Sequence, residues 1–129
     1  MTDNDGAGIV GVNTIGIPVV DQDRALAFYR DILGLEVRVD APMPQVGGRW
    51  IMLGATGSPV TVSLVPAKDE TPAGVETGIR FEASDADRAH AALVRGGGEV
   101  GEVLRWPGVP VMFAAHDPDG NRFEVVQTG

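Results

Sequence analysis

Apolar and polar positions alternate along the chain in a way that predicts two similar halves. In the first half, short apolar runs of strand length flank one stripe of apolar residues at helical spacing. The predicted strands cover residues 9–20, 35–39, 49–53 and 60–65, and the predicted helix begins at Asp21 and ends at Gly34. Proline and glycine gather at 40–48 and 54–59, which indicates a loop and a turn between these strands.

The second half repeats the same order of elements. Strands are predicted at 78–83, 99–104, 109–115 and 122–127, and a helix at 85–95. The pentapeptide at 21–25, Asp-Gln-Asp-Arg-Ala, returns about half a chain later at 85–89 as Asp-Ala-Asp-Arg-Ala. Aspartate at the start of each helix is a favourable N-cap. A repeat at a fixed distance indicates that one supersecondary unit is present twice.

We therefore predict an α+β fold built from two βαβββ modules in one domain. The domain covers residues 1–129, with modules at 9–66 and 76–127 and a flexible leader at 1–8. A groove between two similar halves is the place where we expect a site.

Two stretches of the chain together resemble a known family. The first runs from Val19 to Leu35 and contains Phe28-Tyr29, and the second is Asp-Pro-Asp-Gly-Asn at 117–121 with the strand after it. They resemble the vicinal oxygen chelate superfamily, which includes glyoxalase I, bleomycin-resistance proteins, fosfomycin-resistance enzymes and extradiol dioxygenases. The resemblance implies that the two modules form open, curved, mixed sheets that enclose a cup. It also implies a homodimer, the state of many members.

The metal-dependent members of this superfamily hold a divalent ion with up to four side chains, from the first and last strand of each module. The resemblance carries these positions to Thr14, Ser63, Gly78 and Glu124. Only Glu124 matches the usual ligands, and no His, Asp or Glu lies within one position of Thr14 or Ser63. Divalent cations need several strong N, O or S donors. We therefore expect no metal and no other cofactor.

Charged residues on two predicted strands are the best candidates for site chemistry. Glu124 is the best candidate for a catalytic base or a ligand contact. Its alternative role is a carboxylate paired with Arg122 or Arg80. Period two places Arg80 on one face with Gly78 and Glu82, where its planar fork could orient a carboxylate or carbonyl ligand. An ion pair of Arg80 with Glu82 or Glu124 explains this arginine equally well.

Aromatic and sulfur-bearing side chains beside predicted loops suit either an apolar ligand or a dimer interface, and the sequence does not separate the two. Trp50 and Met52 alternate on the strand after the loop at 40–48. His116 precedes a turn and is predicted to be a surface or rim histidine, with a replacement metal ligand or an acid/base as the alternative. The ligand-binding residues predicted overall are Thr14, Trp50, Met52, Ser63, Arg80 and Glu124.

Composition narrows the classes of partner. The chain has 18 acidic and 10 basic residues and a formal net charge of -8, so we expect no nucleic acid or anionic membrane partner. There is no cysteine, which excludes disulfides and thiolate chemistry. No apolar run is long enough to span a bilayer and no signal pattern is visible, so we expect a cytoplasmic protein.

The leading hypothesis is a metal-independent protein that holds an apolar or amphipathic metabolite or antibiotic in the cup of a homodimer. The alternative is a lyase, isomerase or dioxygenase of the same superfamily. Such an enzyme would use Glu124 as a base, or a non-standard metal site that includes His116. A third possibility is a dimerising module without a small-molecule role. The sequence leaves open whether the chain is an enzyme.

Overall fold

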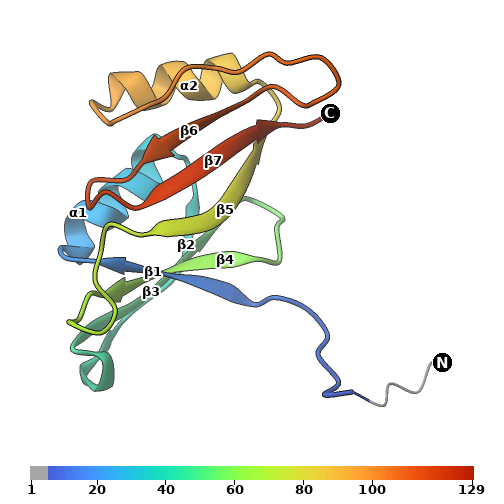
Figure 1. Cartoon of the computed structure of the whole chain (residues 1–129). Coiled ribbons are helices and arrows are strands. Elements are labelled where there is room, and N and C mark those ends of the chain that lie inside the picture. The colour runs from blue at the N-terminus through green and yellow to red at the C-terminus, as the bar shows by residue number, and fades with distance from the viewer. Residues whose placement is uncertain (1–5) are drawn as a thin grey trace.

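The computed structural model describes residues 6–129 and shows two mixed β-sheets with one helical segment each (Figure 1). The predicted leader at 1–8 lies mostly outside the described residues. The first half contains β1 (Thr14–Val19), α1 (Gln22–Ala27), the π-helical turn η1 (Phe28–Ile32), β2 (Glu36–Met43), the 3-10 turn η2 (Pro44–Val46), β3 (Gly48–Gly54) and β4 (Thr61–Pro66). The second half contains β5 (Glu76–Ala83), α2 (Ala86–Arg95), β6 (Met112–His116) and β7 (Arg122–Gln127).

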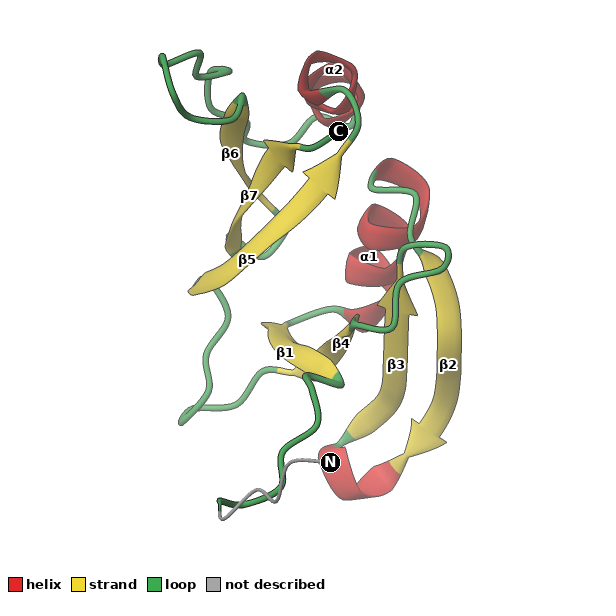
Figure 2. Ribbon diagram, turned by 90° about the vertical axis from the view of Figure 1, so that its right-hand side faces the viewer, coloured by secondary structure: helices red, strands yellow, loops and turns green. Residues whose placement is uncertain are grey.

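The sheets have corresponding strand orders. The first sheet runs β1-β4-β3-β2 and the second runs β5-β7-β6. In each sheet the first strand of the half pairs in parallel with the last one, and the other neighbours are antiparallel. Figure 2 shows the first sheet with α1 in the lower half of the molecule and the second sheet with α2 in the upper half. This arrangement confirms the predicted α+β fold class.

The repeated aspartates cap the two helices as predicted. The Asp21 carboxylate accepts a hydrogen bond from the Arg24 amide at 3.1 Å, and the Asp85 carboxylate accepts one from the Arg88 amide at 3.1 Å. Each bond satisfies one amide that a helix start would otherwise leave unpaired. The first helical segment ends at Gly34, whose φ of 77° lies in the left-handed region that glycine tolerates best.

Strand β1 is shorter than the predicted strand at 9–20. It begins at Thr14, which pairs with Thr61, the first residue of β4. The Asn13 carbonyl still accepts a hydrogen bond from the Thr61 amide at 3.1 Å, but residues 6–12 run away from both sheets (Figure 1). Ile9 and Val10 are therefore exposed although they are apolar.

The predicted loop at 40–48 is also corrected. Strand β2 continues to Met43, which pairs with Gly48 across the short turn η2. Pro42 lies inside this strand, where its missing amide does no harm because β2 is the outer strand of its sheet.

The predicted strand at 99–104 is reduced to two isolated bridges, Val100 with Ala115 and Leu104 with Met112. The Gly101 amide donates to the Ala114 carbonyl at 2.8 Å and the Leu104 amide to the Met112 carbonyl at 2.7 Å. Between these two bonds the chain advances three residues, from Gly101 to Leu104, whereas β6 advances only two, from Ala114 to Met112. This mismatch interrupts a regular ladder.

The two sheets share one apolar core. Ile17, Leu53 and Leu64 of the first sheet belong to the same buried cluster as Phe113 and Phe123 of the second. Side chains from η1 connect the halves, because the Phe28 ring lies 6.2 Å from the Phe123 ring and Tyr29 is fully buried. Each sheet thus has an inner face towards the core and an outer face directed away from it. No helix within residues 6–129 combines the length and apolar character needed to cross a membrane.

Candidate ligand-binding site

The outer face of the second sheet carries a row of charges beside a small apolar patch. Strand registers align the residues of this face in three rows across β5, β7 and β6. The rows are Glu76, Arg122 and His116; Arg80, Glu124 and Ala114; and Glu82, Val126 and Met112. The first two rows hold most of the charge, and the third adds two apolar residues next to Ala114.

The charged residues form a continuous chain of ion pairs. The Arg80 Nε donates to Glu124 Oε1 at 2.7 Å, and Arg122 Nη2 donates to Glu124 Oε2 at 3.3 Å. The Arg122 Nη1 also donates to Glu76 Oε1 at 2.5 Å. Both alternative partners predicted for Glu124 are therefore present, and its carboxylate lies between two guanidinium groups.

Glu76 is the last residue in this series of ion pairs. A hydrogen bond from the Gly78 amide, together with the Arg122 guanidinium, holds the pKa of the Glu76 carboxyl below its usual range. The bond to Glu76 in turn raises the pKa of Arg122. Both shifts favour the charged forms of Glu76 and Arg122, as expected for an ion pair.

On the outer face of the first sheet, four of the predicted residues share one side. Gly16, Ser63 and Met52 align across β1, β4 and β3, and period two adds Thr14 and Trp50 to the same face. The hydroxyls of Thr14 and Ser63 lie 2.6 Å apart and share a hydrogen bond. Ser63 is almost fully buried, whereas Trp50 and Met52 are half-buried and form the apolar part of this face.

The positions that correspond to metal ligands do not fit a divalent cation. Gly78 has a φ of 73°, a conformation that disfavours any residue with a side chain. The Thr14 and Ser63 hydroxyls bond to each other. Glu124 is flanked by two arginines, whose charges oppose a cation. Within residues 6–129, no group of three or more His, Asp or Glu side chains could hold a metal ion.

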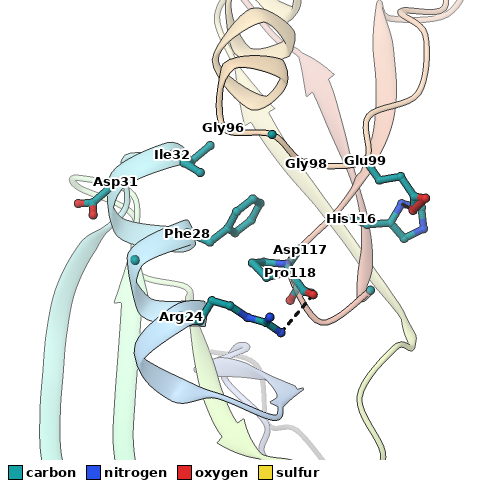
Figure 3. A pocket seen from close by; sticks show the side chains of 13 residues that line it. Arg24, Phe28, Asp31, Ile32, Gly96, Gly98, Glu99, His116, Asp117 and Pro118 are labelled. Atoms are coloured by element: carbon teal, nitrogen blue, oxygen red, sulfur yellow. Dashed lines mark hydrogen bonds and ion pairs between the residues drawn. The ribbon is translucent and has the colours of Figure 1, made fainter.

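Two cavities lie on the inner side of the sheets. One, of about 890 Å³, is bounded by apolar residues such as Leu53 and Phe81, and it also touches Arg80. The other, of about 770 Å³, lies between η1 and the glycines after α2. Figure 3 shows Phe28 and Ile32 on one side of this second cavity, facing Gly96 and Gly98. Among the six predicted ligand-binding residues, all but Arg80 are outside both cavities.

The histidines have structural contacts. The His116 ring points away from Phe28 (Figure 3), and its Nδ1 lies 3.4 Å from Glu99 Oε1. His90 Nε2 lies 2.9 Å from the Gly101 carbonyl oxygen, and its ring packs edge-on against Phe113. His116 is the last residue of β6, the strand-end position predicted from the turn after it, and it lines the second cavity.

Sequence reasoning missed a buried polar network at the turn 117–121. The Tyr29 hydroxyl donates to Asp117 Oδ2 at 2.8 Å, and the Asn121 amide nitrogen donates to the Pro18 carbonyl at 2.8 Å. Asn121 Oδ1 accepts from the amides of Gly74 and Val75. The two motifs that carry the family resemblance thus bond to each other. The sequence predicts only a turn at 117–121 and gives no sign of this contact.

Comparison with known proteins agrees with this fold. The profile of the glyoxalase/bleomycin resistance protein/dioxygenase superfamily matches residues 11–125. No curated protein matches the chain.

Solved structures provide several similar chains. TnmS3, an antibiotic binding protein from Streptomyces sp. CB03234, has 28% identity and a TM-score of 0.83, with 96% of this chain and 100% of that chain covered. A superfamily member from Sphaerobacter thermophilus DSM 20745 has 29% identity and a TM-score of 0.78, with 93% and 98% covered. A glyoxalase/bleomycin resistance protein from Streptomyces sp. CB03234 has 28% identity and a TM-score of 0.78, with 91% and 100% covered. The chain belongs to the glyoxalase/bleomycin resistance protein/dioxygenase superfamily.

Proposed function

We propose that the protein binds a small apolar or amphipathic molecule, a metabolite or an antibiotic, without a divalent metal. The observation that carries this proposal is the environment of Glu124, which is paired with Arg80 at 2.7 Å and with Arg122 at 3.3 Å. A cation bound there would have to lie beside two positive charges with little help from Thr14, Ser63 or Gly78. Both oxygens of the Glu124 carboxylate accept hydrogen bonds from these arginines, so the carboxylate is already held by donors of the protein.

The ligand site is expected in a cup that two copies of the chain complete, in a cytoplasmic homodimer. In one chain, the outer faces of both sheets point away from the shared core. The half-buried Trp50 and Met52 of one face, and Met112 and Val126 of the other, offer apolar surface for a ligand. TnmS3 is an antibiotic-binding protein at 28% identity, which supports a ligand of this kind.

The two tryptophans of the chain allow a direct test. Trp50 lies on the outer face of the first sheet, whereas Trp106 lies in the loop before β6 and is 59% exposed. N-phenyl-1-naphthylamine, an apolar fluorescent probe, should bind saturably and quench tryptophan emission. The quenching should be lost in Trp50→Phe and retained in Trp106→Phe. Saturable quenching that persists in Trp50→Phe and disappears in Trp106→Phe would place the ligand elsewhere and refute the proposal.

A further inference from the structure

We infer that the ligand carries an acidic oxygen and that Arg80 is the residue that selects for it. This inference rests on the proposed function and specifies the class of ligand. It follows from the hydrogen bonds that Arg80 and Arg122 make on the outer face of the second sheet.

Arg80 is paired with Glu124 through Nε and has most of its donors unused. Within residues 6–129, its side chain makes one hydrogen bond, from Nε to Glu124 Oε1 at 2.7 Å. A guanidinium is planar and has five N–H donors in a fixed geometry. The bond at Nε uses one of these donors and leaves the two terminal nitrogens free. The side chain is 67% exposed, so these donors are accessible from the outer face.

Arg122 differs from Arg80 in this respect. Its two terminal nitrogens donate to Glu76 and to Glu124, so both are already engaged with carboxylates. Its side chain is 37% exposed, little more than half the exposure of Arg80. Arg122 thus acts as the support that positions Glu124, and Glu124 positions Arg80. The free guanidinium edge of Arg80 matches a carboxylate, sulfonate or phenolate oxygen.

The neighbouring rows indicate the shape of the ligand. Val126 and Met112 lie one row beyond Arg80 and Glu124 and are half-buried. Val126 is the diagonal neighbour of Arg80 across the pair of strands β5 and β7. A ligand with an acidic oxygen at Arg80 can therefore place an apolar body over Val126 and Met112. Glu82, beside Val126, disfavours a second anionic group there.

Two probes that share the same aromatic rings, but differ in charge, separate the effect of the charge on affinity from that of the rings. The anionic probe is 1-anilinonaphthalene-8-sulfonate, and N-phenyl-1-naphthylamine has the same rings without the sulfonate. In Arg80→Gln, we expect the affinity for the sulfonate to fall about tenfold, and the affinity for the neutral amine to stay within about twofold. Arg88→Gln is the matched control, because it removes the same charge from an exposed position on α2, on the inner side of the second sheet.

The outcomes separate this inference from the proposed function. If Arg80→Gln leaves the affinity for the sulfonate unchanged while Trp50→Ala weakens the binding of both probes, the ligand site stands and the inference is wrong. An equal loss of sulfonate affinity in Arg88→Gln would also overturn it, because net charge alone would then explain the effect. If neither probe binds saturably to the parent protein, both the inference and the proposed function fail.

Discussion

At the scale of single residues, the backbone conformation at position 78 disfavours any side chain. Gly78 has a φ of 73°, and a Cβ built there meets no atom within 4 Å. Strain in the backbone, and not lack of space, is therefore what opposes a side chain at this position. The bulge in β5 between Glu76 and Arg80 requires this glycine, and the Gly78 amide bonds to Glu76.

Gly78→Ala should destabilise the protein by about 1 kcal/mol, because a left-handed backbone conformation is less favourable for alanine than for glycine. Gly16→Ala is the matched control on the outer face of the first sheet. Its built Cβ meets only Val65 Cγ2 at 3.7 Å, an ordinary contact, so the variant should keep or slightly raise stability. Urea unfolding measures both. Equal stability of the two variants would contradict the account of β5.

Asn121→Ala should lower the free energy of unfolding by about 2–4 kcal/mol, because the change leaves several buried polar groups unpaired. The side chain is fully buried and bonds to Pro18, Asp117, Gly74 and Val75. Gln45→Ala, at an exposed position in η2, provides the comparison and should change little. A loss below about 0.5 kcal/mol for Asn121→Ala would show that the network contributes little.

At the scale of elements, a buried hydrogen bond joins the turn between β6 and β7 to η1, and so links the two halves. The Tyr29 hydroxyl reaches the buried Asp117 carboxylate at 2.8 Å. Burial, followed by the nearby Asp117 charge and their hydrogen bond, raises the pKa of Tyr29 well above its usual range. The neutral phenol is therefore the form that the folded state favours.

The single tyrosine of the chain makes this contact measurable. Because the folded-state pKa is raised, the stabilisation is fully present below the unfolded pKa of about 10 and is lost as pH rises above it. Tyrosinate absorbance should thus appear only together with unfolding, in one alkaline transition followed by circular dichroism. A tyrosinate signal near pH 10 in a protein that is still folded would contradict the buried bond.

How well each element could be predicted depends on whether its cause is local. The N-caps at Asp21 and Asp85 and the helix end at Gly34 are local signals, and the structure confirms them. The limit of β1 depends on where its distant partner β4 begins, which no local pattern contains. The bulge that interrupts 99–104 likewise arises from its register with β6. On the site, period two placed Arg80 on one face of its strand with Glu82, but its position beside Glu124 required the strand register.

At the scale of the whole molecule, the direction of the two outer faces determines what one chain can bind. Both sheets turn their inner faces to one core, so both outer faces point away from it. The outer face of the second sheet is charged, and that of the first exposes Trp50 and Met52 in part. A cup that combines the two kinds of surface requires a second copy, and for this reason we propose a homodimer.

Sedimentation equilibrium should accordingly give the mass of two chains, with dissociation on dilution. Probe binding should weaken as the dimer dissociates, since each cup draws residues from both copies. A protein that sediments as one chain and still binds N-phenyl-1-naphthylamine with unchanged affinity would refute the shared cup.

The central claim is that ligand binding does not depend on a metal. It is tested most directly by elemental analysis of protein purified without chelator, combined with a probe titration of the same sample before and after addition of EDTA. We predict far less than one divalent ion per chain and the same affinity for N-phenyl-1-naphthylamine in both titrations. One tightly bound divalent ion per chain, with probe binding lost on chelation and restored by the metal, would contradict the claim.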